Sequence, residues 1–280
     1  MKKIAVLYHK NCFDGFGAAW AARKKFGDKA EYIAVEHQNP PPTGLKGKDV
    51  YLVDFNYSPE ITGKILKEAR KLAIMDHHIT GKESVKLAHE SLYDINHSGA
   101  VLAWKFFHPR KRTPRLLLHI EDGDLWRFRL KGTRELQGYL DARDFDFRLW
   151  DKVAAALEKS DGGKEYFRQG KAILDYQRKL VKKAVERAAP VKFGGYETLA
   201  VNSPFFQSEL GNALVLKYPP IGIVWSEKNG KILVSLRSDG KTDVSKIAVK
   251  HGGGGHKAAS CFSFPAPGPF PWRALKKRKK

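Results

Sequence analysis

Residues 71–78 read Lys71-Leu72-Ala73-Ile74-Met75-Asp76-His77-His78, an apolar run that ends in a carboxylate and two imidazoles. The apolar part predicts a buried strand, which would release these three polar side chains into one turn. Carboxylate and imidazole ligands together suit divalent ions such as Mn²⁺. The alternative is an ordinary turn of three polar residues. Other polar strand ends upstream and a glycine-rich histidine segment downstream favour a metal centre.

Three more apolar runs precede this one and alternate with helical segments. We predict strands over residues 4–8, 31–35, 50–53 and 72–75, and helices over 17–26 and 59–71. Strands separated by helices in this way indicate a parallel sheet with right-handed crossovers. Ligands gather at the carboxyl ends of the strands in such sheets. His9, Asp54 and Asp76 all follow strand ends, so we expect them at one edge of the sheet.

The second half of the chain changes from helices to strands. We expect helices over residues 99–107, 114–120 and 150–158, a long basic helix over 166–187, and strands over 198–201, 221–225 and 232–236. Asn229-Gly230 predicts a hairpin turn between the last two strands. The fold class is therefore α/β, with an N-terminal domain over 1–150, a helical linker over 151–190, a smaller C-terminal α/β domain over 191–265 and a basic tail over 266–280. Residues 265–271 are expected to be loose.

The chain of 280 residues carries a formal net charge of +21. Without the six basic residues of the segment 273–280 the charge is still +15, so the folded body is itself basic. Such a charge concentrates polyanions, of which nucleic acid is the usual one. A lysine-rich, solvated surface of the thermophile kind is the alternative. Charge supports a phosphate-bearing substrate without identifying it.

The composition also indicates the cellular compartment in which the protein is expected. The sequence has no apolar run of membrane-spanning length and no secretory signal, and its two cysteines, Cys12 and Cys261, give no disulfide framework. A cytoplasmic protein without membrane partners is the expectation.

Other polar groups flank the predicted strands. The turn His9-Lys10-Asn11-Cys12-Phe13-Asp14-Gly15 brings a histidine and an aspartate directly after a strand, and Asp54 ends another. Helix capping is the alternative role for both aspartates. Residues 121–124, Glu-Asp-Gly-Asp, offer more carboxylates or merely loop charges. Together these groups supply the ligands of a two-metal centre, with Asp54 as the natural bridge between the ions.

The C-terminal half contributes groups suited to anions. The four glycines Gly252–Gly255 expose backbone N–H groups that can cradle a phosphate, and His256 can donate to the same anion. Arg237 offers a planar fork for bidentate phosphate contact. A flexible glycine loop beside a surface arginine is the alternative.

These motifs resemble those of the DHH/DHHA1 phosphoesterase superfamily, which includes RecJ-like exonucleases, nanoRNases and cyclic-dinucleotide phosphodiesterases. The resemblance implies a catalytic DHH domain, two Mn²⁺-type ions and a DHHA1 domain that grips the substrate. By this resemblance His78 touches the scissile phosphate and Asp76 orients its neighbours. The implied metal ligands are His9, Asp14, Asp54, His77 and Asp122, and the implied substrate-binding residues are Arg237, Gly253, Gly254, Gly255 and His256.

The sequence departs from the family pattern in its first motif. The family carries two aspartates spaced by one residue, whereas here Cys12 stands two positions before Asp14. One metal site thus loses a carboxylate or takes Asn11 or Cys12 as a substitute. In the fourth motif we prefer Asp122 to Asp124, because Trp126 stands four residues after Asp122. Cys261 replaces a family glycine.

The leading hypothesis is a Mn²⁺-dependent phosphodiesterase, with Mg²⁺ or another divalent ion as the alternative cofactor, which hydrolyses short single-stranded RNA or DNA to nucleoside monophosphates. Aromatics such as Phe205, Phe206 or Trp225 would stack bases. Core packing is the alternative role, and it is the expectation for Trp225. The alternatives are hydrolysis of polyphosphate, pyrophosphate or a cyclic (di)nucleotide, and a nucleic-acid-binding protein without turnover. Sugar type, strand length, polarity and a homodimeric state are left open.

Overall fold

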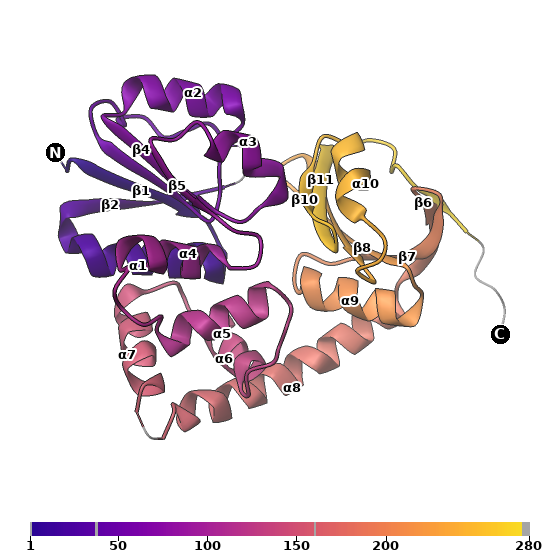
Figure 1. Ribbon diagram of the computed structural model, residues 1–280. Coiled ribbons are helices and arrows are strands. Elements are labelled where there is room, and N and C mark those ends of the chain that lie inside the picture. The colour runs from indigo at the N-terminus through magenta and orange to yellow at the C-terminus, as the bar shows by residue number, and fades with distance from the viewer. Residues whose placement is uncertain (1, 37–38, 160, 276–280) are drawn as a thin grey trace. The chain divides into compact units, whose positions relative to one another are not determined.

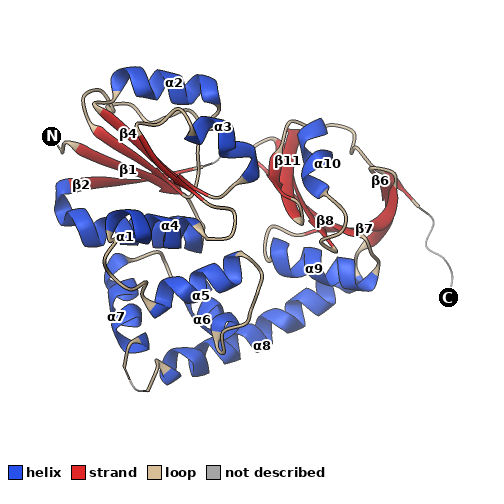
Figure 2. Ribbon diagram, in the orientation of Figure 1, coloured by secondary structure: helices blue, strands red, loops and turns tan. Residues whose placement is uncertain are grey.

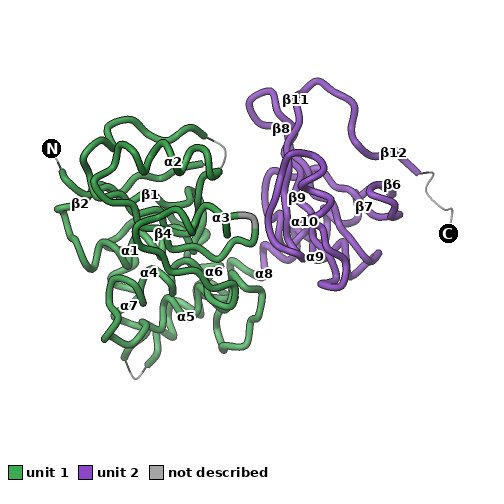
Figure 3. Tube along the Cα trace, turned by 45° about the horizontal axis from the view of Figure 1, so that its top comes forward, with its two compact units in different colours: residues 1–174 green, residues 175–280 purple. Residues whose placement is uncertain are grey.

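The computed structural model describes residues 2–36, 39–159 and 161–275. It divides into two compact units, residues 1–174 and 175–280 (Figure 3). The first unit thus runs past residue 150 and includes the first part of the segment expected to be a linker. The last five residues of the basic tail, 276–280, lie outside the described residues.

The first unit is built on a five-stranded parallel sheet with the strand order β2-β1-β3-β4-β5 (Figures 1 and 2). The parallel sheet predicted from the sequence is therefore confirmed. Strand β5 was not predicted, because its four residues are half-buried or exposed and carry little apolar signal. The strands are β1 (Ile4–His9), β2 (Ala30–Val35), β3 (Asp49–Val53), β4 (Lys71–Asp76) and β5 (Glu90–Tyr93).

Helices cover both faces of this sheet, which explains the apolar runs of its central strands. On one face α1 (Phe13–Phe26) and α4 (Gly99–Phe107) pack against strand residues that include Val6, Val53 and Met75. On the other face α2 (Pro59–Glu68) and the short α3 (Lys82–Val85) cover the alternating set that includes Leu7, Leu52 and Ile74 (Figure 1). Two single-turn 3₁₀ helices, Gly27–Lys29 and Ile79–Gly81, complete the connections.

Four more helices follow: α5 (Arg115–Asp124), α6 (Thr133–Asp141), α7 (Phe147–Leu157) and α8 (Lys164–Glu186). The predicted long basic helix is confirmed as α8, and the boundary between the two units falls within it. Gly170 lets α8 approach α6 closely, since a Cβ atom there would lie 1.7 Å from the carbonyl oxygen of Glu135. Within the described ranges, none of the helices combines the length and apolar composition needed to cross a bilayer.

The second unit contains a seven-stranded mixed sheet with the order β10-β11-β9-β8-β7-β6-β12. Helix α10 (Val244–Lys250) covers one face and α9 (Gln207–Lys217) the other. Asn229 and Gly230, at φ 51° and 71°, make the predicted hairpin turn between β8 and β9. The strands are β6 (Ala189–Phe193), β7 (Tyr196–Asn202), β8 (Ile221–Lys228), β9 (Lys231–Ser238), β10 (Gly254–His256), β11 (Ala259–Pro265) and β12 (Arg273–Ala274).

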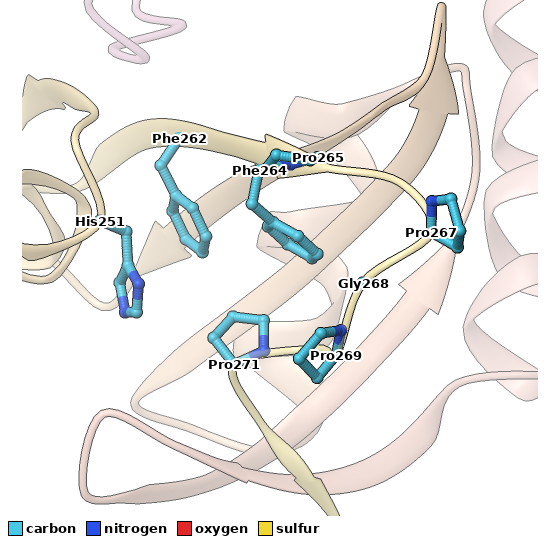
Figure 4. Close-up of a pocket in the computed structure, with 8 residues that line it drawn as sticks. All are labelled: His251, Phe262, Phe264, Pro265, Pro267, Gly268, Pro269 and Pro271. Atoms are coloured by element: carbon cyan, nitrogen blue, oxygen red, sulfur yellow. The ribbon is translucent and has the colours of Figure 1, made fainter.

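The segment 265–271 was expected to be loose, and this prediction is wrong. Phe270 packs against Trp225 with ring centroids 4.7 Å apart, and β12 pairs with β6 directly after the segment. The segment lines a pocket of about 410 Å³ together with His251, Phe262 and Phe264 (Figure 4). Trp225 has the packing role expected of it.

Candidate metal centre

Polar residues leave three adjacent strands of the parallel sheet at the same edge. His9 is the last residue of β1, Asp54 follows β3, and Asp76 ends β4 immediately before His77. Neighbouring strands are about 4.8 Å apart, and β3 lies between β1 and β4. The sheet therefore holds these side chains within reach of common ions, as the sequence predicted.

The buried imidazole of His77 lies at the centre of three carboxylates. Its Nε2 atom is 3.3 Å from Oδ1 of Asp54, 3.6 Å from Oδ2 of Asp14 and 3.8 Å from Oδ2 of Asp124. His77 is 2% exposed, so these charges interact in a poorly solvated environment. Burial opposes protonation of His77, but the carboxylates outweigh it and raise its pKa to about 9.

Asp54 carries the clearest indication that a cation belongs here. Its side chain is buried, and neither carboxylate oxygen accepts a hydrogen bond from the described residues. Burial, followed by the charge of Asp14, raises its pKa well above the usual value. In the metal-free protein the protonated imidazole of His77, 3.3 Å away, neutralises part of this buried charge. One imidazolium cannot balance three carboxylates, so the remaining negative charge favours a bound cation. The donor set therefore fits a divalent metal ion.

Asp14, by contrast, is anchored by the protein backbone. Its two oxygens accept hydrogen bonds from the N–H groups of Gly99 and Ala100, at 2.6 and 2.9 Å, where helix α4 begins. The positive end of the helix dipole favours its negative charge. This fixes the carboxylate in place, with Oδ2 still facing His77.

A second group of ligand atoms shares Asp54. His9, Cys12 and Asp54 each offer one such atom, all within 4.8 Å of one another. Nδ1 of His9 is 3.9 Å from Oδ2 of Asp54, whereas His77 faces Oδ1. Asp54 thus has one oxygen toward each group, which is the geometry of a bridging ligand. The thiol of Cys12 therefore lies where the sequence predicted a substitute ligand.

Asp76 has a different environment from these carboxylates. Its Oδ1 atom accepts hydrogen bonds from the backbone N–H groups of His77 and His78 and lies 2.7 Å from Nδ1 of His78. Its other oxygen accepts a hydrogen bond from Asn56. Asp76 is fully buried, and these contacts hold the two histidines in position. Burial opposes protonation of His78, but Asp76 outweighs it and raises the pKa of that imidazole.

The structure brings Asp124, and not Asp122, to His77. The carboxylate of Asp122 accepts hydrogen bonds from the N–H groups of Arg129 and Leu130 and from the hydroxyl of Thr133, at 2.6–3.0 Å. We therefore transfer the ligand assignment to Asp124. The sequence signal that favoured Asp122 fits Asp124 equally well, because Phe128 stands four residues after it.

The predicted substrate-binding residues lie in the second unit. Arg237 donates hydrogen bonds to Oγ of Ser208 and to the carbonyl of Leu236, at 2.7 and 2.9 Å, and burial lowers its pKa. Gly253 precedes β10, the strand that contains Gly254, Gly255 and His256. A Cβ atom at Gly253 would lie 2.0 Å from the carbonyl oxygen of Cys261, so only glycine fits there. The glycine segment is thus an ordered edge of the sheet.

Gly99 was not among the predicted site residues, yet it supports two carboxylates. A Cβ atom there would lie 2.5 Å from Cβ of Asp54. Gly99→Ala should therefore displace Asp54 and weaken Mn²⁺ binding about tenfold, measured by calorimetric titration. Gly63→Ala is the matched control, since nothing lies within 4 Å of a Cβ atom at Gly63. Unchanged Mn²⁺ affinity in Gly99→Ala would contradict this packing argument.

The metal-free protein is expected to lose stability as pH rises. Burial raises the pKa of Asp54 and raises that of Asp124 to about 7, so the folded state binds more protons than the unfolded state. The raised pKa of His77 acts in the same direction at higher pH. Thermal midpoints in chelator should fall between about pH 5 and about pH 9. The decline should be shallower in Asp54→Asn, and a level wild-type profile would refute the expectation.

Comparisons with known proteins agree with these features. Residues 213–274 match the family model for the DHHA1 domain. The chain is 32% identical over 285 residues to the uncharacterized protein R106 of Acanthamoeba polyphaga mimivirus, covering 92% of this chain and 67% of that protein.

Two solved structures share the fold. RecJ of Thermus thermophilus, in complex with Mn²⁺, aligns with a TM-score of 0.54 and 13% identity over 94% of this chain and 50% of RecJ. An exopolyphosphatase-related protein of Bacteroides fragilis aligns with a TM-score of 0.57 and 14% identity over 96% and 88% of the two chains. The Asp76-His77-His78 triplet, the two-unit architecture and the DHHA1 match together show that the chain belongs to the DHH/DHHA1 superfamily, whose members are metal-dependent phosphoesterases.

Proposed function

We propose that the protein is a divalent-metal-dependent phosphodiesterase that hydrolyses short single-stranded oligonucleotides to nucleoside monophosphates. The observation that carries this proposal is the convergence of Asp14, Asp54 and Asp124 on His77, with both oxygens of Asp54 lacking hydrogen-bond donors among the described residues.

The ligands divide into two sets that share Asp54. Asp14, His77 and Asp124 would hold one ion with Asp54, and His9 and Cys12 would hold the other. Two divalent ions would supply a water of lowered pKa and neutralise the charge that develops on the phosphoryl group. Mn²⁺ accepts carboxylate and imidazole ligands, and it is the ion in the structure of RecJ from Thermus thermophilus.

Protein groups orient the phosphodiester. Asp76 accepts a hydrogen bond from Nδ1 of His78 and raises the pKa of that imidazole, which favours the protonated ring. In this form Nε2 also carries a proton, which we assign as the donor to an oxygen of the scissile phosphate. In the second unit, Arg237 and the backbone of Gly253–Gly255, with His256, would bind a phosphate group. Ser208 and Leu236 fix the Arg237 guanidinium in one orientation before substrate arrives.

Charge and exposed aromatics support a nucleic-acid substrate. A net charge of +21 attracts polyanions over a long range. Phe205 is 67% exposed and lies three residues before Ser208, so it could stack a base close to Arg237. The Bacteroides fragilis relative of the fold is described as exopolyphosphatase-related, which makes polyphosphate the substrate to test against.

The test is incubation with Mn²⁺ and end-labelled RNA and DNA strands of about two to about twenty nucleotides, with polyphosphate in parallel. Stepwise release of monophosphates by the wild type, and its loss in His77→Ala, would support the proposal and reveal sugar, length and polarity preference. Loss in His77→Ala excludes a contaminating nuclease. Turnover of polyphosphate alone would overturn the oligonucleotide proposal while keeping the metal centre, and binding without turnover would indicate a silent nucleic-acid-binding protein.

A further inference from the structure

An exposed loop of aromatic and basic residues begins directly after Asp124. It comprises residues 125–131, Leu-Trp-Arg-Phe-Arg-Leu-Lys, and we call it the aromatic loop. Trp126 is 38% exposed, although an indole ring is more often buried in a core. The loop places this ring two residues from a carboxylate that faces His77. The aromatic loop therefore begins at a residue of the metal centre and lies in the same unit.

The backbone of the aromatic loop is strained. Trp126 has φ 55° and Phe128 has φ 49°, values that favour glycine and are unusual for bulky side chains. Residues kept in such conformations cluster at functional sites, because the surrounding structure must hold them against the strain. A loop with only a connecting role would lose nothing by carrying glycine at these two positions.

Asp122 supplies the contacts that hold the loop. Its carbonyl oxygen accepts hydrogen bonds from the N–H groups of Arg127 and Phe128, at 2.8 and 3.1 Å. Its carboxylate accepts those of Arg129 and Leu130, at 2.8 and 3.0 Å. One buried residue therefore fixes four consecutive peptide units, and the exposed indole projects from a rigid base.

Of the two aromatic rings in the loop, that of Phe128 is covered by a neighbouring side chain. The guanidinium of Arg134 lies 3.4 Å from the ring centroid of Phe128, and Trp126 meets Phe128 edge-on at 4.9 Å. The same guanidinium also lies over the ring of Trp126, 5.6 Å from its centroid, so Phe128 and Arg134 together hold the indole in place. The exposed indole is pre-positioned at little entropic cost to a planar ligand.

We propose that Trp126 stacks on a nucleobase of the nucleotide at the scissile phosphate, with the exposed Arg129 and Lys131 contacting neighbouring phosphates. This inference rests on the proposed phosphodiesterase function and names its substrate class: a chain of nucleotides has a planar group to stack, and polyphosphate has none. Aromatic surfaces interleaved with basic residues are the usual means of binding single strands without sequence preference.

Binding of a labelled tetranucleotide, measured by fluorescence anisotropy in chelator, tests the inference without turnover. Trp126→Ala should weaken binding about 5- to 150-fold, the range for one stacked base, and Trp126→Phe should recover most of the loss. The same phosphodiester backbone without bases should bind wild type and Trp126→Ala equally. Tyr176→Ala is the matched control, because Tyr176 is an aromatic residue of α8 that is 64% exposed and is not part of the aromatic loop.

Stability separates stacking from a structural role. Trp126→Gly should melt at a higher temperature than Trp126→Ala, since both lack the ring but only glycine adopts φ 55° without strain, and it should lose the base-dependent affinity as well. If Trp126→Ala lost the same affinity for the intact and the base-free strand, or lost none for either, the inference would be overturned. Absence of hydrolysis by the wild type would overturn the proposed function alone, because the binding comparison does not depend on turnover.

Discussion

Replacing Asp54 by asparagine should reduce phosphodiester hydrolysis by about three orders of magnitude while making the metal-free protein more stable. Asp54 turns one oxygen toward His77 and the other toward His9, so its loss removes a ligand from both ion sites. Loss of about 4 kcal/mol of charge stabilisation corresponds to this factor. Stability should rise by about 1–2 kcal/mol, because the substitution removes a buried charge that lacks hydrogen-bond donors.

Single-turnover cleavage with saturating Mn²⁺ and thermal melting in chelator measure the two effects separately. Asp28→Asn is the matched control, since Asp28 is an exposed carboxylate whose ion pair with Arg23 contributes little. A variant that kept wild-type activity would show that Asp54 is not a bridging ligand. A variant that melted earlier than wild type in chelator would show that its carboxylate is stabilised by contacts other than a metal.

Cys12→Asp should shift the metal preference of the protein from Zn²⁺ toward Mn²⁺ by about 100-fold. Thiolates favour zinc and cobalt, whereas carboxylates suit manganese and magnesium. The thiol of Cys12 lies close to the ligand atoms of His9 and Asp54. Burial, and to a smaller extent the negative charges of Asp124 and Asp14, raise the pKa of this thiol to about 12. A bound cation would reverse this effect and allow the thiolate to form.

Competitive titration of Zn²⁺ against Mn²⁺ gives the shift in preference, and the near-ultraviolet absorption of a thiolate bound to Co²⁺ reports the ligand itself. This absorption should be present in wild type and absent in Cys12→Asp. Cys261→Ser should retain it, since Cys261 is exposed in the other unit. Persistence of the absorption in Cys12→Asp would remove Cys12 from the ligand set.

The parallel sheet could be predicted because its strands are buried on both faces and their apolar runs are continuous. Lys71–Asp76 shows this best, since the apolar residues Leu72 to Met75 have no exposed surface. The second sheet was harder to predict. In β11 (Ala259–Pro265) small residues precede the two phenylalanines and Ser263 separates them, and β6 (Ala189–Phe193) contains a proline, so neither strand has a long apolar run. Contacts distant in sequence decide these strands.

The candidate ligands at strand ends, and Asp14 in the turn after β1, followed from topology, whereas the ligand on helix α5 did not. Asp122 and Asp124 are two residues apart near the end of α5, so their side chains point about 200° apart around the helix axis. Only the packing of α5 decides which of them faces His77. Each of the two aspartates has an aromatic residue four positions after it, so this spacing cannot tell which one is the ligand. Burial and hydrogen bonding, rather than residue type, separate the ligand from the residue that holds the aromatic loop.

The ligands of the centre come from segments as far apart as His9 and Asp124, and three of those segments depend on the pairing of β1, β3 and β4. The unfolded chain cannot assemble them, so an ion binds only the folded form. At about 1,000 times its Kd, such an ion adds about 4 kcal/mol to the free energy of unfolding. Proteases cleave the transiently unfolded fraction of a protein, and a bound ion makes that fraction smaller. The supply of metal would then set the lifetime of the protein as well as its catalytic rate.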